Sequence, residues 1–136
     1  RVTVGDVVAF VGRGSKSTAM FRLAGELKMA MPREHIELLE SAELSHRSGD
    51  YYFVHAGVRP GVSLDEQRRA DLLWIRHEFL RSQEPFGKIV VHGHTPEREP
   101  VMRSNRIGID TGAVFTGCLT ALRLESGTRT FLQVAS

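Results

Sequence analysis

Two histidines stand directly behind short apolar runs that end in turns. His55 follows Tyr-Tyr-Phe-Val and precedes Ala-Gly, and His94 follows Ile-Val-Val-His-Gly and precedes Thr-Pro. Runs rich in β-branched and aromatic residues are typical of buried strands, and the glycines indicate where each strand ends. Two such strands would bring both imidazoles to one edge of a sheet. Imidazoles that converge there are the ligands that a metal-dependent hydrolase needs.

A carboxylate and two guanidinium groups are further candidates for this chemistry. Asp6 ends the run Val-Thr-Val-Gly-Asp, where it could bind a metal or simply close a strand turn. Arg13 opens a polar Gly/Ser loop, and Arg76 follows Trp74 and Ile75 in an otherwise apolar turn. Both arginines could be ordinary surface charges. A buried guanidinium needs an anion, however, and a phosphate offers the bidentate geometry that suits it.

Three other polar residues are expected to support this site. His92 lies two residues before His94, so on an extended strand both would share a face, and we expect His92 to be structural or to support a ligand. Arg59 is a weaker candidate for a contact to substrate or to backbone carbonyls. Asp110 precedes Thr-Gly and is expected to hydrogen-bond within a turn, or alternatively to bond a ligand histidine.

The elements that must position these residues are mixed in type. A capping-box spacing predicts a helix start at Ser63–Glu66, and apolar periodicity predicts a helix over 71–80. Alternation in the last third predicts a hairpin whose turn lies at 126–127. Strands are expected at 2–4, 51–55, 89–91, 107–110, 119–124 and 131–134, and further helices at about 17–23 and from residue 32. Strand–helix units followed by consecutive strands indicate an α/β layer structure with a partly antiparallel sheet.

Composition limits the class of protein. A length of 136 residues predicts one domain, 1–136, and an apolar content of 41% is enough for a globular core. No apolar run is long enough to cross a membrane, and the single Cys118 excludes an internal disulfide, so we expect a cytoplasmic protein. The net charge of +2 comes from dispersed arginines, which argues against a nucleic-acid surface.

Four motifs, in order, resemble the phosphoprotein-phosphatase family of metallophosphoesterases, and most of all its bacterial and phage serine/threonine phosphatases. The motifs lie at 53–61, 72–76, 93–96 and 105–120, and the resemblance extends over about residues 32–134. It implies a calcineurin-like fold, in which a two-sheet β-sandwich is flanked by helices. The fold is expected to be incomplete here, without the N-terminal metal-site loops.

The resemblance also implies roles for individual residues. His55, His94 and Asp6 match metal ligands of the family, while Arg13 and Arg76 match arginines that bind the substrate phosphate. The implied cofactors are two divalent ions, with manganese expected first and iron, zinc or magnesium as alternatives. The implied substrate is a phosphoserine or phosphothreonine protein, or another small phosphoester. A dinucleoside polyphosphate hydrolase, with an aromatic residue to stack on the nucleoside, and a non-catalytic phosphate-binding relative are the alternatives.

The sequence departs from the family pattern at three places. Val8 stands where the first metal-site turn has its histidine, and no aspartates precede Arg13 to form the second turn. The Gly-Asn-His-Glu turn, whose histidine would be the general acid, is absent. Either the chain is a catalytically dead relative, or the sequence joins segments of a longer chain. We expect the second, with joins near 9–10, 12–13 and 22–29, because every absent piece would be a loop at a strand end.

Overall fold

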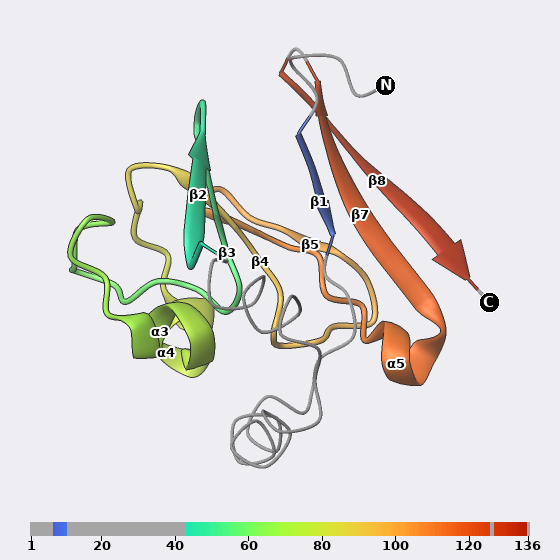
Figure 1. The fold of residues 1–136 in the computed structure, drawn as a ribbon, viewed down its shortest axis with the longest axis horizontal. Helices are drawn as coiled ribbons and strands as arrows, with labels where there is room; N and C mark the ends of the chain where they lie inside the picture. Colours follow the sequence, from blue (N-terminus) through green and yellow to red (C-terminus); the bar gives the residue numbers. More distant parts are fainter. Residues whose placement is uncertain (1–6, 11–42, 126, 136) are drawn as a thin grey trace, which may run out of the picture. The chain divides into compact units, whose positions relative to one another are not determined.

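Two β-sheets form the framework of the described chain (Figure 1). The structure, a computed structural model, describes residues 7–10, 43–125 and 127–135. Within these residues it contains eight strands and three short helices, so the expected mixed α/β class is confirmed. The expected strand at 2–4 and the expected helices at 17–23 and from residue 32 lie outside the described residues.

The larger sheet has the strand order β2-β3-β4-β6-β5. Its central strands β3 (Tyr51–Val54), β4 (Ile89–His92) and β6 (Arg106–Gly108) run parallel. The edge strands β2 (Ser45–Ser48) and β5 (Val101–Met102) run antiparallel to their neighbours. Because the central strands are parallel, their carboxyl ends meet at one edge of the sheet, which is where the two histidines were expected.

The smaller sheet is antiparallel and has the order β1-β7-β8. β7 (Cys118–Glu125) and β8 (Thr128–Ala135) pair along their whole length, which confirms the predicted hairpin. Gly127 in the connecting turn has a φ of 81°, a conformation that glycine adopts without a steric penalty. The turn therefore sets the register in which the two strands pair.

β1 (Val7–Phe10) pairs with β7 at the other edge of the hairpin. The expected join at residues 9–10 falls inside this strand, whose register continues from Val7 to Phe10. The joins expected near 12–13 and 22–29 lie outside the described residues. All three stay predictions, and the mass of the natural protein is the measurement that tests them.

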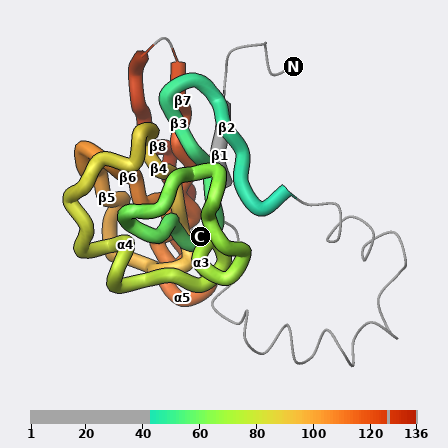
Figure 2. The backbone as a smooth tube through the Cα atoms, turned by 90° about the vertical axis from the view of Figure 1, so that its left-hand side faces the viewer, coloured from blue at the N-terminus to red at the C-terminus, as the bar shows by residue number. Residues whose placement is uncertain are grey.

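The larger sheet is apolar on both faces. Side chains on one face, Tyr52 and Val90 among them, pack against Leu72, Ile75 and Phe79 of the helical segment. On the other face Val91 and Ile107 pack against Leu122 and Leu124 of β7. Figure 2, viewed from the side of the helices, shows this segment lying in front of the sheet. The three layers thus bury two apolar clusters, one on each face of the larger sheet, and these hold the edge that carries the histidines.

The helical segment differs from the expected single helix over 71–80. It forms two short helices, α3 (Arg69–Trp74) and α4 (His77–Arg81). Ile75 leaves helical geometry with a ψ of 143°, and Arg76 follows with a φ of −133°. The predicted apolar face is right, but the continuity is wrong, because burial of Ile75 in the core overrides helix propensity at this point.

The helix start expected at Ser63–Glu66 is also wrong. The Ser63 hydroxyl donates to the Glu66 carboxylate, and the Glu66 amide donates to the Ser63 carbonyl, which closes a turn. α3 begins only at Arg69. The third helix, α5 (Ala113–Thr116), links β6 to β7 and is a single turn. None of the described helices is long or apolar enough to cross a membrane.

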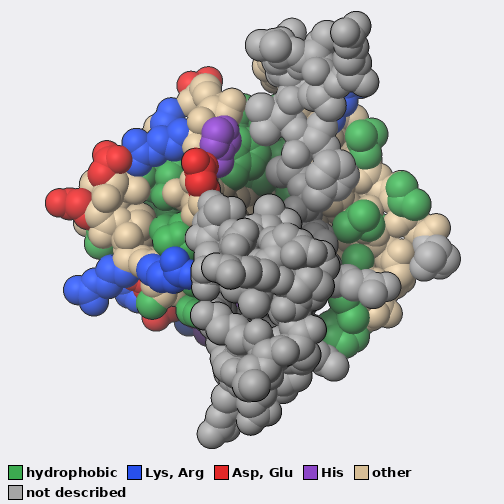
Figure 3. Space-filling view, in the orientation of Figure 1, with side chains coloured by type: hydrophobic (Ala, Val, Ile, Leu, Met, Phe, Trp, Pro, Cys, Tyr) green, Lys and Arg blue, Asp and Glu red, His purple; other side chains and the backbone are tan. Residues whose placement is uncertain are grey.

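Charged and apolar side chains occupy different parts of the face drawn in Figure 3. Charged side chains gather on the left, over the larger sheet and its helices, and apolar side chains lie on the right, on the side of the smaller sheet. Leu119, Leu132 and Val134 of the β7–β8 hairpin are among the exposed apolar residues. The hairpin thus contributes to the core through one face of β7 and leaves most of β8 exposed.

Candidate active site

His55 and His94 meet at the carboxyl ends of β3 and β4. The Nε2 atom of His55 lies 3.1 Å from the Nδ1 atom of His94, and the ring centroids are 4.9 Å apart. The backbone joins the two turns as well, since the Gly93 amide donates to the His55 carbonyl over 2.9 Å. The structure therefore brings together the two histidines that the sequence singled out.

His94 adopts a backbone conformation that is rare for a residue with a side chain. Its φ is 66°, and it is the one described residue other than glycine with a positive φ. The Thr95 amide donates to the Gly93 carbonyl over 2.7 Å, so His94 is the central residue of a γ-turn, a strained arrangement. Strain of this kind is concentrated at functional sites. Here it turns the imidazole out of the line of β4 and toward His55.

His92 contacts the helical segment, as His94 does, but it belongs to the core and not to the histidine pair. His92 is the last residue of β4 and is buried, with its ring 4.8 Å from the Phe79 ring. Its Nδ1 atom lies 3.2 Å from the Gly93 carbonyl oxygen, while Nε2 has no hydrogen-bond partner. A side chain at Gly108 would touch this ring at 3.3 Å. His92 is thus a core residue, as its structural interpretation predicts.

Arg76 completes a row of polar groups with the two histidines. Its Nε atom donates to Nε2 of His94 over 3.2 Å, while Arg76 itself is exposed. The break between α3 and α4 aims the side chain in this direction. This contact places a guanidinium beside the histidine pair.

Both histidines of the pair are held in the neutral form. Burial lowers the pKa of His94 to about 4, and the neighbouring His55 and Arg76 add to this effect. Partial burial lowers the pKa of His55, and the charge of Asp110 opposes the shift. Neutral imidazole is the form that coordinates a metal ion.

The spacing of the two facing nitrogens suits a shared cation. Two ligands at about 2.0–2.1 Å from one ion, at angles between about 90° and the tetrahedral angle, lie roughly 2.9–3.4 Å apart. The separation of His55 Nε2 and His94 Nδ1, 3.1 Å, falls in this range. Among the described residues no third histidine, cysteine or carboxylate joins them as a ligand group. Asp6 and Arg13, the other predicted site residues, lie outside the described residues.

Asp110 follows β6 at the same edge of the sheet. Its carboxylate accepts a hydrogen bond from the Gly112 amide over 2.9 Å, so the predicted turn role is confirmed. It also raises the pKa of the nearby histidines, although desolvation dominates in each case. Asp110 is therefore a fixed negative charge close to the pair.

Arg59 has a different role from the substrate contact considered for it. Its guanidinium makes a two-point ion pair with the carboxylate of Asp71 in α3, at 2.6 and 3.0 Å. Hydrogen bonding from Arg59 lowers the pKa of Asp71. The Ala56 amide donates to the Leu72 carbonyl over 2.8 Å, which gives a second link. Together they attach α3 to the turn that carries His55.

Trp74 is the site residue that the sequence analysis did not assign. Its ring stands nearly perpendicular to the His94 ring, at 83°, with the centroids 5.7 Å apart. The signal that could have found it is its position two residues before Arg76, inside one of the four motifs. The site therefore has an aromatic wall in addition to the histidines and the guanidinium.

Comparison with known proteins finds curated relatives and a solved structure. No protein-family model matches the chain. A curated protein of Anoxybacillus flavithermus named bis(5'-nucleosyl)-tetraphosphatase PrpE is 57% identical over 112 residues, covering 71% of this chain and 46% of that protein. A Halalkalibacterium halodurans protein of the same name is 31% identical over 117 residues, covering 74% and 48%. The chain thus spans about half the length of the curated relatives it matches.

A solved structure has the same fold. It is described as a proposed diadenosine tetraphosphatase, has a TM-score of 0.66 and 20% identity, and is matched over 88% of this chain and 66% of its own. The fold likeness supports the two-sheet architecture expected from the sequence.

Proposed function

We propose that this chain carries part of the active site of a metal-dependent hydrolase of dinucleoside polyphosphates. The observation that carries the proposal is the contact row from His55 through His94 to Arg76, with the Trp74 ring beside it. Such a row combines two neutral metal-binding nitrogens, a phosphate-binding cation and an aromatic wall.

The substrate is better matched by a nucleotide than by a phosphoprotein. The curated relatives from two bacteria are both named as tetraphosphatases of bis-nucleosyl substrates. A nucleoside substrate favours an aromatic ring near the phosphate site, and the Trp74 ring beside His94 is the candidate for this role. Stacking of a base on an aromatic side chain contributes about 1–3 kcal/mol.

The residues of this chain would have two roles, metal binding and phosphate binding. His55 and His94 would hold one divalent ion, manganese by the sequence resemblance, and Asp6 is the proposed carboxylate ligand of a second. A bound divalent ion supplies an acidified water and charge stabilisation in phosphoester hydrolysis. Arg76, with Arg13 as a second proposed contact, would bind phosphoryl oxygens through paired hydrogen bonds. The general acid stays unassigned.

Arg76 cannot keep its present partner when a cation occupies His94. The Nε–H group of Arg76 donates to Nε2 of His94, so that nitrogen must be unprotonated and Nδ1 must carry the ring proton. If His94 held the ion through Nδ1, the ring proton would move to Nε2, and an N–H group cannot accept a hydrogen bond. Loading of the site would therefore release Arg76, which leaves its guanidinium available to the substrate.

The test is hydrolysis by the natural full-length protein with Mn²⁺. We expect metal-dependent cleavage of diadenosine tetraphosphate with a higher kcat/KM than that for a phosphopeptide. Trp74→Leu should raise KM for the dinucleotide and leave cleavage of an aryl phosphate unchanged, and Trp74→Phe should restore it. Arg76→Gln should lower kcat for both substrates, because it removes a contact to the reacting phosphate.

Two outcomes would contradict the proposal. A higher kcat/KM for the phosphopeptide than for diadenosine tetraphosphate would favour a protein phosphatase instead. Absence of metal-stimulated turnover, together with a natural mass equal to 15.2 kDa, would instead support the non-catalytic phosphate-binding alternative.

A further inference from the structure

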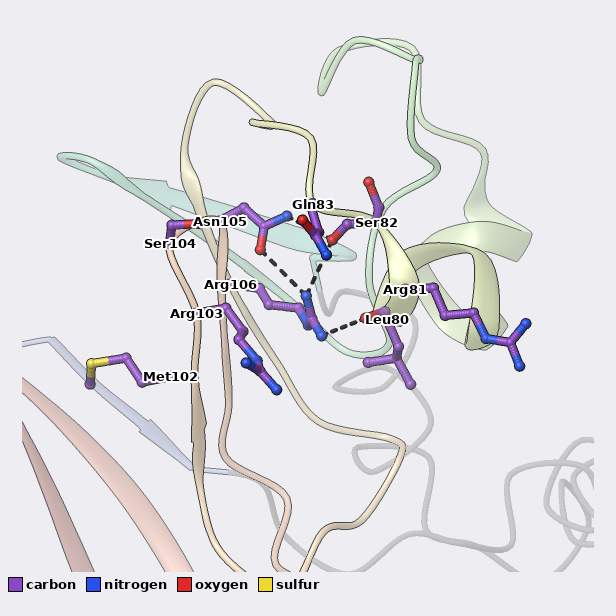
Figure 4. A pocket seen from close by; sticks show the side chains of 9 residues that line it. All are labelled: Leu80, Arg81, Ser82, Gln83, Met102, Arg103, Ser104, Asn105 and Arg106. Atoms are coloured by element: carbon purple, nitrogen blue, oxygen red, sulfur yellow. Dashed lines mark hydrogen bonds between the residues drawn. The ribbon is translucent and has the colours of Figure 1, made fainter.

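A polar pocket of about 620 Å³ lies at the end of the larger sheet away from the histidine pair (Figure 4). Its walls are residues 80–83, at the end of α4 and just beyond it, and residues 102–106, which lead from β5 into β6. This volume is within the range of about 300–1,000 Å³ that is typical of small-molecule sites. Three arginines and no acidic residue line it.

The pocket is separate from the candidate active site. Arg106 is the first residue of β6 and pairs with Val90, whereas His55 and His94 follow the last residues of β3 and β4. Because these strands are parallel, the pocket lies at their amino ends and the histidine pair at their carboxyl ends. None of the candidate active-site residues lines the pocket.

Two guanidinium groups lie next to each other without an acidic partner. Figure 4 shows those of Arg103 and Arg106 side by side, while Arg81 points away. Burial lowers the pKa of Arg106, and the charge of Arg103 lowers it further. Neither arginine makes an ion pair among the described residues. Arg106 instead donates to neutral acceptors, the carbonyls of Leu80 and Ser82 and the side-chain oxygen of Asn105.

Hydrogen bonds of Asn105 and Arg106 join the two walls of the pocket. Asn105 is buried, and its side-chain amide donates to the Ser82 and Glu84 carbonyls over 3.0 and 2.9 Å. The guanidinium of Arg106 also lies over the Phe79 ring, 5.9 Å from its centroid. These bonds connect the two segments that form the pocket. Pre-organised groups bind a ligand with less loss of conformational freedom.

We propose that this pocket binds a small anion that carries a polyphosphate chain. Arg103 and Arg106 would bind the phosphate oxygens, for which guanidinium geometry is well suited. The described pocket lining contains no aromatic residue on which a base could stack. The phosphate chain is therefore the recognised part, so free tripolyphosphate and a nucleoside triphosphate should bind with similar Kd.

Calorimetric titration of the full chain tests this proposal. The parent protein carries Arg76→Gln and is kept in EDTA, so that the candidate active site does not bind phosphate. Sodium tripolyphosphate and ATP are titrated separately. We expect one saturable site, and Arg103→Gln should weaken Kd at least about tenfold, since it removes one charge-assisted contact.

A matched variant controls for net charge. Arg69→Gln removes an exposed arginine of α3 that does not line the pocket, and it should leave Kd unchanged. Arg106→Lys keeps the charge but loses the forked donor, and it should weaken both probes equally. The proposal is overturned if tripolyphosphate shows no saturable binding, if ATP alone binds, or if Arg69→Gln and Arg103→Gln weaken binding to the same extent.

Discussion

Replacing Gly57 with alanine should be among the most damaging single changes in the turn that carries His55. A Cβ atom at Gly57 would lie 2.3 Å from Cδ1, 2.6 Å from Cγ and 2.8 Å from Cε1 of the Phe79 ring. Carbon atoms normally approach to about 3.5–4.0 Å. Phe79 is completely buried and also contacts the rings of Phe86 and His92, so the ring has no free space to enter.

The magnitude follows from this overlap. To accept the new methyl group, the Phe79 ring would have to move by more than about 1 Å in a packed core. Overpacking of this size lowers the free energy of unfolding by about 3 kcal/mol, the upper end of the usual range. Gly61→Ala is the control, because Gly61 has a φ of 74° but no atom within 4 Å of the added methyl group. It should cost only the backbone strain of alanine, roughly 1–2 kcal/mol. Urea unfolding, followed by circular dichroism, measures both values.

A double-mutant cycle isolates the steric part. Gly57 has a φ of 158°, so alanine there also carries backbone strain that does not depend on Phe79. In a Phe79→Leu background the overlap with the ring should be relieved. Gly57→Ala should then lower the free energy of unfolding by at least about 1 kcal/mol less than it does in the natural background. Additive costs in the cycle would refute the reasoning. We also expect weaker Mn²⁺ binding by Gly57→Ala, because the displaced turn carries His55.

Three further predictions concern polar groups. Burial lowers the pKa of His92 to about 4, below its unfolded value of 6.5, so the unfolded state binds more protons between these pH values. The contribution of His92 to the free energy of unfolding should therefore be complete above pH 6.5 and fall by roughly 3 kcal/mol as the pH drops to 4. Urea unfolding at a series of pH values measures this fall, which should be smaller in His92→Leu. Asn105→Ala should cost about 2–3 kcal/mol, because the carbonyls of Ser82 and Glu84 lose their donor, and an unchanged urea midpoint would disprove this. Arg59→Ala should lower the thermal midpoint, since it leaves the nearly buried carboxylate of Asp71 unpaired, and an equal effect of Ser104→Ala at an exposed position would contradict it.

The strands were predictable from the sequence because their patterns are local. The runs at 51–54 and 89–92 are dense in β-branched and aromatic residues, and the alternation in the β7–β8 hairpin has the period of a strand. Their parallel order then follows from the chain that connects them. The meeting of His55 with His94 could therefore be anticipated from two strand ends.

The finer geometry of the site could not be predicted, because tertiary contacts determine it. No glycine or proline marks the break between α3 and α4, which forms where Ile75 enters the core. The γ-turn at His94 likewise has no sequence signature apart from the preceding glycine. The pairing of Arg59 with Asp71 joins residues 12 apart, and nothing in the intervening sequence specifies it. The helix break orients Arg76, the γ-turn orients His94, and the ion pair attaches α3 to the turn that carries His55.

Trp74 gives this chain a built-in optical probe. It is the single tryptophan among the 136 residues, so all indole emission comes from one position. That position lies edge-on to His94, whose ring contacts both His55 and Arg76. Emission from the unlabelled chain should therefore respond separately to protonation of the histidine pair, to cation loading and to the departure of Arg76. The order of these three events can be timed by stopped-flow mixing, without a substrate and without a reporter group.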